Sequence, residues 1–536
     1  MAVFQRRWFM WDLARQRRFD RDEFIMVATK LKELGYNGIG LYLEGAFELK
    51  CIGGGKLRKG VMTYEDAVWA NEKCKELGLF LFPMTNVVGH MEHFLRQERF
   101  KHLCAAGDIS THDIAFDTMP EEAEEFALKI LYEYMEAFDT DYIHIGGDEV
   151  RLTDNNRPVY AKFLSGLCEK LLADGKKPAI WNDLLWKHKE LAGEFNRDIE
   201  IFDWWYKGHR PMSIEFFTEK GFKNVVACPC ENSWVGFISH QFLRDWVIDE
   251  DQTPVDSDEI EAFLQDAVLK ANPERLYGMY AHWEDTMGRD LWGQWSPIAR
   301  AGLFMQGKFQ YKTRDDEAIE KAIFGRITPY TEIMHIIQDE IHSLFRNPAL
   351  VSYVRMALFT KKNFYDAATE SLKTGRDLYG EAKEAICKVE TLLEGWETQN
   401  EFEKLCKADL VSVAAMMRAS LSLKSAFAAC EKYYTEAAKI QFADPDKAKA
   451  LVLEFAKGFE TSVELIKKYK ATVSDLVSLT AHTETDLVKL DTTTRFTEKM
   501  ANFLKDFASS EEFGEIPLPT INFVLDWVVD EAVIEK

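Results

Sequence analysis

The stretch Tyr142-Ile143-His144-Ile145-Gly146-Gly147-Asp148-Glu149 decides the fold class of this chain. Its apolar first half predicts a short β-strand that ends near Ile145. Two glycines follow, and they let the backbone turn before two adjacent carboxylates. In α/β barrels the chemistry lies at the carboxyl ends of the strands. This order of residues therefore predicts that Asp148 and Glu149 belong to a functional site.

The first 310 or so residues alternate short apolar runs with amphipathic segments. The strand candidates are Trp8–Leu13, Gly38–Leu43, Leu79–Met84, Tyr142–Ile145, Pro178–Trp181, Ile199–Asp203, Asn224–Cys228 and Leu276–His282. The helix candidates between them include Arg21–Leu34, Tyr64–Leu77, Pro120–Phe138, Tyr160–Ala173 and Ser257–Ala271. This alternation predicts an α/β fold, a (β/α)8 TIM barrel. A doubly wound open sheet would alternate too, but no glycine-rich phosphate loop opens the first helix.

The character of the sequence changes after about residue 312. Prolines nearly vanish between Asn347 and Ser510, and long segments rich in Ala, Lys, Glu and Leu take over. Asp409–Tyr434 is a long candidate helix within this part. We predict a catalytic barrel over residues 1–312, followed by an all-α C-terminal domain over residues 313–536. We expect the helical domain to pack against the barrel or to form a homodimer.

Composition narrows the class of partners. The formal net charge of −23 opposes binding to nucleic acid or to anionic membranes. The chain opens without the pattern of a secretory signal, and we expect no membrane span. The nine cysteines are scattered without metal-type spacing, so we expect reduced thiols, no metal or other cofactor, and a cytoplasmic location. Twelve of the 14 tryptophans precede residue 300, which indicates an aromatic-rich pocket in the barrel.

Carboxylates, cationic groups and aromatic rings follow most of the predicted strands. The candidate substrate-binding residues are Arg7, Glu44, His90, Trp181, Trp204, Trp205, Tyr206, Trp283 and Asp285. Such a mixture describes a carbohydrate site, because sugar C–H faces stack on indoles and sugar hydroxyls bond charged groups. Each of these residues also has a purely structural reading, as core, surface ion pair or hydrogen-bonded histidine. The acid pair is the hardest to explain in that way.

At this point the motifs resemble those of glycoside hydrolase family 20, the β-N-acetylhexosaminidases. His144-Ile-Gly-Gly-Asp148-Glu149 matches the family's His-x-Gly-Gly-Asp-Glu. Arg7-Trp-Phe-Met-Trp-Asp12-Leu-Ala-Arg15 matches its first strand, and Gly89-His90, Trp181 and Trp283-Glu-Asp285 follow in order. The resemblance covers about residues 5–310 and is closest in style to compact bacterial members without a signal peptide. Asn86 departs from the family, where many members have Asp.

The resemblance implies retaining, substrate-assisted hydrolysis of terminal β-linked GlcNAc or GalNAc from small glycans by an exo-acting enzyme. The sugar's own acetamido oxygen would attack the anomeric carbon and form an oxazolinium ion. Glu149 would be the general acid, and Asp148 would orient the acetamido group. The substrate would be an amino-sugar oligosaccharide or glycoconjugate.

Further roles follow from the resemblance by position. Arg7 would grip the C3 and C4 hydroxyls, and Asp285 would hold the C4 and C6 hydroxyls. Trp181 and Trp283 would wall the sugar pocket, with Trp204 or Trp205 as a third wall. His90 would join the hydrogen bonds of the acid. The tyrosine that contacts the acetamido oxygen stays open between Tyr206 and Tyr280.

Two other classes of function stay open at this stage. One is a metal-dependent barrel enzyme in which Asp148, Glu149 and Glu44 bind a divalent cation. The other is a non-catalytic sugar-binding scaffold that assembles through its helical domain.

Overall fold

The computed structural model describes residues 3–15, 17–52, 60–108, 110–205, 213–230, 257–284, 291–311, 313, 315–341, 378–481 and 485–520. These residues form two compact units. The first contains the described residues up to Glu284, together with Gln294–Gly325. The second contains Leu291–Gly293 and the described residues from Arg326 onward.

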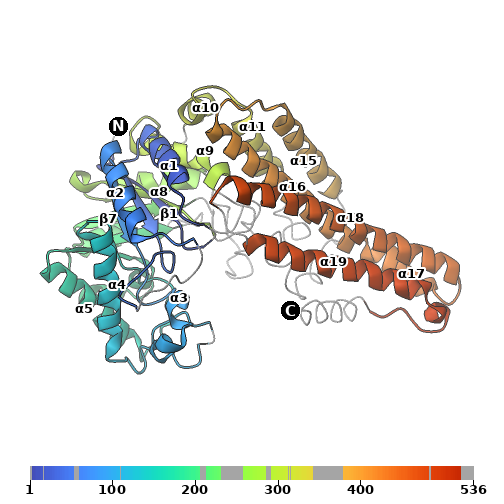
Figure 1. Cartoon of the computed structure of the whole chain (residues 1–536), viewed down its shortest axis with the longest axis horizontal. Helices are drawn as coiled ribbons and strands as arrows, with labels where there is room; N and C mark the ends of the chain where they lie inside the picture. Colours follow the sequence, from blue (N-terminus) through green and yellow to red (C-terminus); the bar gives the residue numbers. More distant parts are fainter. Residues whose placement is uncertain are drawn as a thin grey trace. The chain divides into compact units, whose positions relative to one another are not determined.

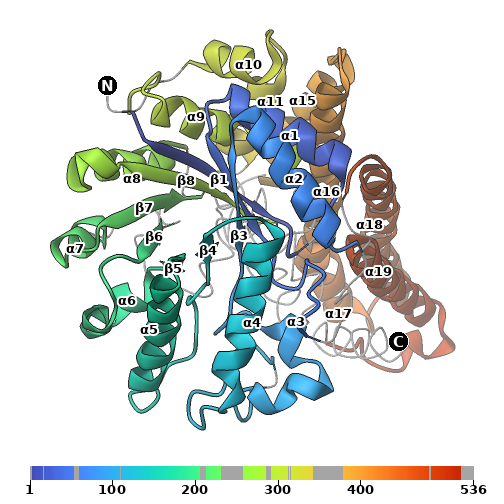
Figure 2. The same cartoon turned by 60° about the vertical axis from the view of Figure 1, so that its left-hand side comes forward.

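The first unit is a closed barrel of parallel strands in the order β1 to β8, with helices around it (Figures 1 and 2). The strands are β1 Arg6–Asp12, β2 Gly38–Tyr42, β3 Phe80–Met84, β4 Tyr142–His144, β5 Lys177–Trp181, β6 Glu200–Trp205, β7 Asn224–Pro229 and β8 Tyr277–His282. All eight predicted strands are present, with ends within two residues of the prediction. The predicted TIM barrel is therefore confirmed.

The helices of this unit lie between successive strands, except for the last two, which follow β8. They are α1 Arg21–Glu33, α2 Tyr64–Leu77, α3 Glu92–Leu95, α4 Glu122–Ala137, α5 Arg157–Ala173, α6 Asp183–Lys187, α7 Ser213–Glu219, α8 Ser257–Lys270, α9 Trp295–Met305 and α10 Asp316–Phe324. Helix α2 shows how the sequence fixes their ends. Thr63 and Asp66 form a reciprocal capping box at its start, and Gly78 ends it with a left-handed φ of 66°.

Aromatic side chains fill the barrel interior below the strand ends. Trp8 of β1 is 4% exposed. Its ring lies 4.7 Å from Phe82, 5.5 Å from Tyr142 and 6.2 Å from Phe202, measured between centroids. A Cβ atom on the paired Gly38 would lie 2.4 Å from the Trp8 indole, so this strand position needs glycine. The barrel is therefore a packed core, and its chemistry belongs above these rings.

An ion pair between half-buried Arg6 and buried Glu200 closes the amino end of the barrel. Arg6 donates to the Glu200 carboxylate at 2.6 Å, and the Tyr142 hydroxyl donates to the same group. The Arg6 guanidinium also lies 4.7 Å from the centre of the Trp8 ring. The charge of Glu200 is thus satisfied at the end of the barrel opposite the carboxyl ends of the strands.

The second unit is helical in the part that the structure describes. Its elements are η6 Leu291–Gly293, α11 Tyr330–His335, the π-helix η7 Ile336–Ile341, α15 Leu378–Gly395, α16 Glu401–Ala429, the π-helix η10 Cys430–Thr435, α17 Glu436–Ile440, α18 Pro445–Leu479, α19 Thr485–Ser509 and η11 Glu511–Gly514. The predicted helix from Asp409 begins earlier, at Glu401, because the Asn400 side chain caps it by accepting from the Glu403 amide. The rings of Phe427 and Phe459 meet at 5.1 Å in the core between α16 and α18.

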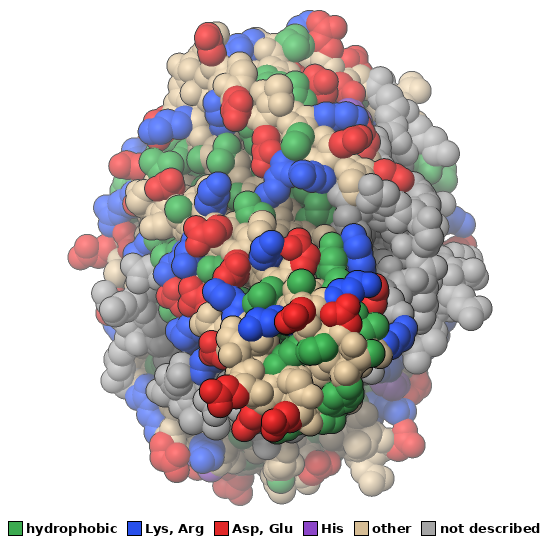
Figure 3. Space-filling view, turned by 90° about the vertical axis from the view of Figure 1, so that its right-hand side faces the viewer, with side chains coloured by type: hydrophobic (Ala, Val, Ile, Leu, Met, Phe, Trp, Pro, Cys, Tyr) green, Lys and Arg blue, Asp and Glu red, His purple; other side chains and the backbone are tan. Residues whose placement is uncertain are grey.

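Acidic and basic side chains are interspersed over the face of the molecule that Figure 3 shows, with hydrophobic side chains between them. One helical stretch, Glu401–Ile440, is long and apolar enough to cross a bilayer, but 71% of its most apolar window is buried. Core helices of folded domains have the same property.

Removal of the Trp8 side chain tests the barrel packing. We expect Trp8→Ala to lower the free energy of unfolding of the barrel by about 3–5 kcal/mol, because it leaves a cavity among three rings. Urea unfolding measures this, with Val68→Ala, whose side chain is 40% exposed on α2, as the control. An equal effect of the two substitutions would contradict the packing described above.

Candidate active site

A left-handed turn follows strand β4 and carries the acid pair. The φ angles are 82° at Gly146, 102° at Gly147 and 52° at Glu149. A Cβ atom on Gly146 would lie 1.5 Å from Oδ1 of Asn86, so no larger residue fits there. The Gly147 amide donates to the same Asn86 oxygen at 3.0 Å, and the Tyr160 hydroxyl donates to the Gly147 carbonyl at 2.7 Å. The glycines therefore allow the turn, and side chains from β3 and α5 hold it.

His90 lies between the two acids. Its Nε2 atom is 3.5 Å from Oδ2 of Asp148 and 3.3 Å from Oε2 of Glu149. The two carboxylates differ in exposure, with 10% of the Asp148 side chain and 58% of the Glu149 side chain open to solvent. Both acids thus meet one imidazole, but one is buried and the other reaches outward.

The charges of this group are mutually dependent. Burial raises the pKa of Asp148, but the His90 charge and hydrogen bonds from His90 and Asn86 outweigh it, so the pKa lies below its ordinary value. Burial lowers the pKa of His90, but the charge of Asp148 and bonds to both acids outweigh it and raise the pKa well above its usual range. Asp148 is therefore a buried carboxylate that faces an imidazolium.

Asn86 adds a donor to this arrangement. Its Nδ2 atom donates to Oδ1 of Asp148 at 3.1 Å and to the Tyr42 hydroxyl oxygen at 2.9 Å. An ionised aspartate could not donate to another carboxylate. The departure from the family at this position thus gives Asp148 a neutral partner.

A third carboxyl group, Asp183, lies behind Glu149. Its Oδ2 accepts the Glu149 backbone N–H at 3.1 Å, and its Oδ1 accepts the Trp204 indole N–H at 3.4 Å. Burial, and then the charge of Asp148, raise the pKa of Asp183 to about 7. We did not include Asp183 among the candidate site residues, although its place directly after Trp181-Asn182 at the end of β5 was the available signal.

Aromatic rings line the floor beside the acids. Trp181 is 1% exposed and Trp283 is 8% exposed, and their ring centres are 6.2 Å apart. The Tyr42 ring meets Trp283 at 4.8 Å, and the His144 ring meets Trp181 at 4.3 Å. The structure therefore brings the predicted Trp181 and Trp283 together. The candidate list missed Tyr42, whose signal was its position as the last residue of β2.

Arg15 and Glu44 form a charged edge beside this floor. Nη1 of Arg15 lies 3.4 Å from Oε1 of Glu44, and the guanidinium carbon lies 5.0 Å from the centres of the Tyr42 and Trp283 rings. Burial raises the pKa of Glu44, but the charges of Arg15, His90 and His93 outweigh it and lower the pKa. Glu44 is therefore an ionised, buried acid at the end of β2, as its place in the predicted site requires.

The structure places Arg7 away from the acid pair. Arg7 is the second residue of β1 and lies at the amino end of the barrel. Its Nε donates to the Gly35 carbonyl at 2.7 Å and its Nη1 to the Phe4 carbonyl at 2.6 Å. These bonds occupy the guanidinium at the end opposite the acid pair. Arg15, which lies beyond the carboxyl end of β1, is instead the cation beside Glu44 and the rings of Tyr42 and Trp283.

The remaining candidate residues lie on opposite faces of their strands or outside the described part of the chain. Trp204 lies beside Asp183, whereas strand alternation places Trp205 on the side of Asp203, whose carboxylate bonds Ser213 of α7 at 2.7 Å. Tyr280 stacks on Phe9 at 6.1 Å, on the helix side of the strands. Tyr206 and Asp285 lie outside the described residues.

The metal-binding alternative named Asp148, Glu149 and Glu44. Within the described part of the chain, the group with ligand atoms close enough for one ion is a different one, His90, Glu92 and His112. The three carboxylates instead pair with His90 or Arg15.

Known proteins resemble this chain to different extents. The family model described as glycosyl hydrolase family 20, catalytic domain, matches residues 83–259, which include both acids. A lacto-N-biosidase from Bifidobacterium bifidum is 25% identical over 173 residues, which are 28% of this chain and only 15% of that protein.

Two solved structures have similar folds. A β-N-acetylhexosaminidase from Bacteroides fragilis is 17% identical, with a TM-score of 0.47 over 60% of this chain and 69% of that one. An exo β-N-acetylglucosaminidase from Vibrio harveyi, in complex with N-acetylglucosamine, is 16% identical, with a TM-score of 0.44 over 63% of this chain and 58% of that one.

A parallel barrel with an acid pair beyond β4 and an aromatic floor, matched by a catalytic-domain family, defines the class of this protein as a glycoside hydrolase. Residues 83–259 of its barrel match the catalytic domain of glycoside hydrolase family 20. The resemblance read from the motif around Asp148 and Glu149 is thereby confirmed.

Substitutions of Arg7 and Arg15 test which of the two arginines contributes to substrate binding. We expect Arg15→Ala to lower kcat/KM by about 10²-fold, since a charged contact at the substrate is worth several kcal/mol at most. Arg7→Ala should leave kcat/KM within about twofold and lower only stability, because it removes bonds to two backbone carbonyls. A larger loss of kcat/KM in Arg7→Ala than in Arg15→Ala would restore the original assignment.

Asp183 is tested by two substitutions. Asp183→Asn keeps an oxygen for the Glu149 amide, whereas Asp183→Ala removes it, so we expect kcat to fall about tenfold only in Asp183→Ala. The Asp183 carboxyl group has a pKa of about 7 in the folded chain, above the value near 4 in the unfolded chain. Its ionisation therefore lowers the free energy of unfolding progressively from about pH 4 to pH 7, and by the full amount at higher pH. Asp183→Asn should therefore raise the melting temperature at pH 8 but not at pH 4. Equal kcat in the two variants would show that the bond to Glu149 does not matter.

Proposed function

We propose that the protein is a retaining exo-β-N-acetylhexosaminidase that removes terminal β-linked GlcNAc or GalNAc by substrate-assisted catalysis. The observation that carries this proposal is the unequal pair of acids around His90. Asp148 is buried and ionised, and Glu149 is largely exposed. Two acids with one role would not need such different surroundings.

In the proposed first step, Glu149 donates a proton to the glycosidic oxygen as the bond to the anomeric carbon breaks. The acetamido oxygen of the same sugar attacks that carbon from the other face and forms an oxazolinium ion. The exposure of Glu149 supports this role, because the leaving group must extend toward solvent. A general acid in such a position contributes roughly 10²–10⁴ in rate.

Asp148 acts on the substrate's amide in this proposal. Its carboxylate accepts the acetamido N–H, which orients the attacking oxygen and stabilises the positive charge that develops on the ring being formed. The Asn86 donor and His90 fix the carboxylate in place. In the second step Glu149 takes a proton from water, which opens the oxazolinium ion from the face that the leaving group left, so configuration is retained.

The aromatic floor supports the choice of an amino sugar. Trp181, Trp283 and Tyr42 offer apolar faces for the acetamido methyl group and the sugar C–H bonds. Arg15 and Glu44 offer charged partners for ring hydroxyls at the edge of the same floor. We assign Arg15 the role in hydroxyl binding that the motif suggested for Arg7.

The substrate class and location remain parts of the proposal. We propose small oligosaccharides or glycoconjugates as substrates in the cytoplasm, where the nine free cysteines would stay reduced. The name of the relative from Bifidobacterium bifidum makes a lacto-N-bioside the second substrate to assay. Cell fractionation with an antibody tests the location, and a signal confined to the culture medium would contradict it.

Substitution of each acid separates the two roles. We expect Glu149→Gln to lower kcat about 10²–10⁴-fold on a β-GlcNAc glycoside with a poor leaving group, and far less on a dinitrophenyl glycoside that needs no proton. Asp148→Asn should lower kcat on both, because the acetamido group must react in either case. Glu98→Gln, at a 91% exposed side chain, serves as the matched control.

Three outcomes would contradict the proposal. A wild-type protein that hydrolyses β-glucosides as fast as β-N-acetylglucosaminides does not use the acetamido group. Loss of activity after exhaustive chelation would favour the metal-dependent alternative. Binding of N-acetylglucosamine without turnover of any β-N-acetylhexosaminide would favour the sugar-binding scaffold.

A further inference from the structure

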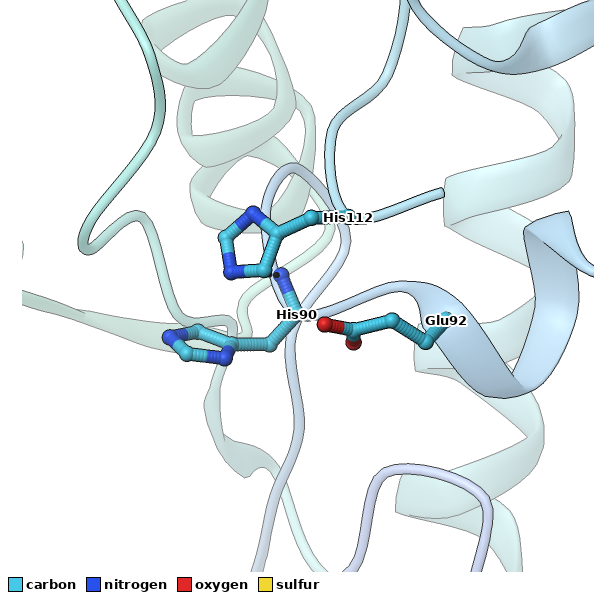
Figure 4. Close-up of side chains that lie close together, drawn as sticks. All are labelled: His90, Glu92 and His112. Atoms are coloured by element: carbon cyan, nitrogen blue, oxygen red, sulfur yellow. Dashed lines mark hydrogen bonds between the residues drawn. The ribbon is translucent and has the colours of Figure 1, made fainter. Parts of the chain in front are cut away.

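Two histidines and a glutamate converge beside the acid pair, on the segment that follows β3 (Figure 4). The ligand atoms of His90, Glu92 and His112 all lie within 4.8 Å of one another. All three residues are half-buried, so an ion from solvent can reach them. Two imidazoles and one carboxylate are a ligand set that zinc uses in catalytic sites.

The outer nitrogen of each histidine is bonded to carboxylate. Nδ1 of His112 bonds the Asp113 carboxylate, and Nε2 of His90 lies 3.3 Å from the Glu149 carboxylate. In metal sites, the ligating histidine almost always gives its other ring nitrogen to such a partner, which fixes the ring and strengthens the ligand. This arrangement leaves Nε2 of His112 and Nδ1 of His90 for the inside of the cluster, where an incoming ion would replace the Nδ1 proton of the His90 imidazolium.

The ligand atoms that face the centre of the cluster make few hydrogen bonds to other described protein groups. Among the described residues, the Glu92 carboxylate has no hydrogen bond or ion pair. Nε2 of His112 accepts the His90 backbone N–H at 3.3 Å, which is a long bond that an ion could replace. The carboxylates of Asp148 and Glu149 lie on the far side of the His90 ring and favour a positive charge there.

We propose that His90, Glu92 and His112 bind a first-row divalent transition-metal ion such as Zn²⁺, and that this ion inhibits the hydrolase. The inhibition rests on the function proposed above, whereas the binding does not. A bound ion places two positive charges beside the His90 ring, which both acids contact. The ion also binds His90, whose ring otherwise contacts both carboxylates.

Direct binding tests the site without any assay of activity. We expect calorimetric titration of the full chain with Zn²⁺ to reveal a site whose affinity falls at least tenfold in Glu92→Gln and in His112→Gln. The matched controls are Glu98→Gln and His102→Gln, whose side chains are 91% and 55% exposed. Titration with Co²⁺ separates this site from the thiols, since thiolate ligands add intense charge-transfer absorption. Identical titrations of wild type and Glu92→Gln would overturn the site.

Kinetics test the inhibitory role. We expect Zn²⁺ to inhibit the wild-type enzyme reversibly, with full recovery on chelation, and to require at least tenfold more ion in Glu92→Gln. Glu92 takes no part in the proposed chemistry, so Glu92→Gln should keep its activity without Zn²⁺. Binding that leaves activity unchanged would overturn the inhibition and retain the site. A chain with no hydrolase activity that still binds Zn²⁺ through Glu92 would overturn the proposed function alone.

Discussion

The site depends on one backbone constraint, the left-handed turn after β4. A regular strand would send neighbouring side chains to opposite faces. Positive φ angles at Gly146, Gly147 and Glu149 break that alternation, so both carboxylates reach the same imidazole. A non-glycine residue with positive φ is uncommon and is held by its surroundings. Here the Asp183 carboxyl group holds the Glu149 amide, and this bond links β5 to the acid.

The electrostatics of the site follow from that geometry. His90 itself has a φ of 51°, and its ring is the cation nearest to both acids. Because Asp148 is ionised and Asp183 has a raised pKa, two neighbouring carboxyl groups divide between the charged and the neutral form. Such a division keeps the orienting anion of Asp148 in the site without a second full negative charge beside it. The neutral Asn86 donor adds to this by stabilising Asp148 without bringing a further charge.

The sequence predicted the architecture well, because apolar runs of strand length are a strong signal when helical periods separate them. The motif around Asp148 and Glu149 also carried enough information for the family. The predicted strand Trp8–Leu13 already placed Arg7 at the amino end and Arg15 at the carboxyl end, but the family pattern favoured Arg7 for the contact with the ring hydroxyls. Tyr42 was not predicted as a site residue, because an aromatic residue at the end of a strand is equally typical of the hydrophobic core.

Asp183 was not predicted as a site residue for a related reason. Its importance comes from a bond to the backbone of a residue 34 positions away, which no local pattern encodes. The sequence alone could not say which of Trp204 and Trp205 on β6 faces the site. The register of β6 in the sheet places the two side chains on opposite faces. Tertiary contacts, and not composition, select the members of the site once the fold is known.

The fit between Gly146 and Asn86 has an evolutionary consequence. No side chain can be added at position 146 while the Asn86 amide lies 1.5 Å from the space it would fill, and Asn86 is also the donor to Asp148. A substitution of Gly146 therefore displaces Asn86 and damages the acid pair. In descendants of this protein, position 146 should stay glycine, and divergence should accumulate on the outer helices, where no such contact exists.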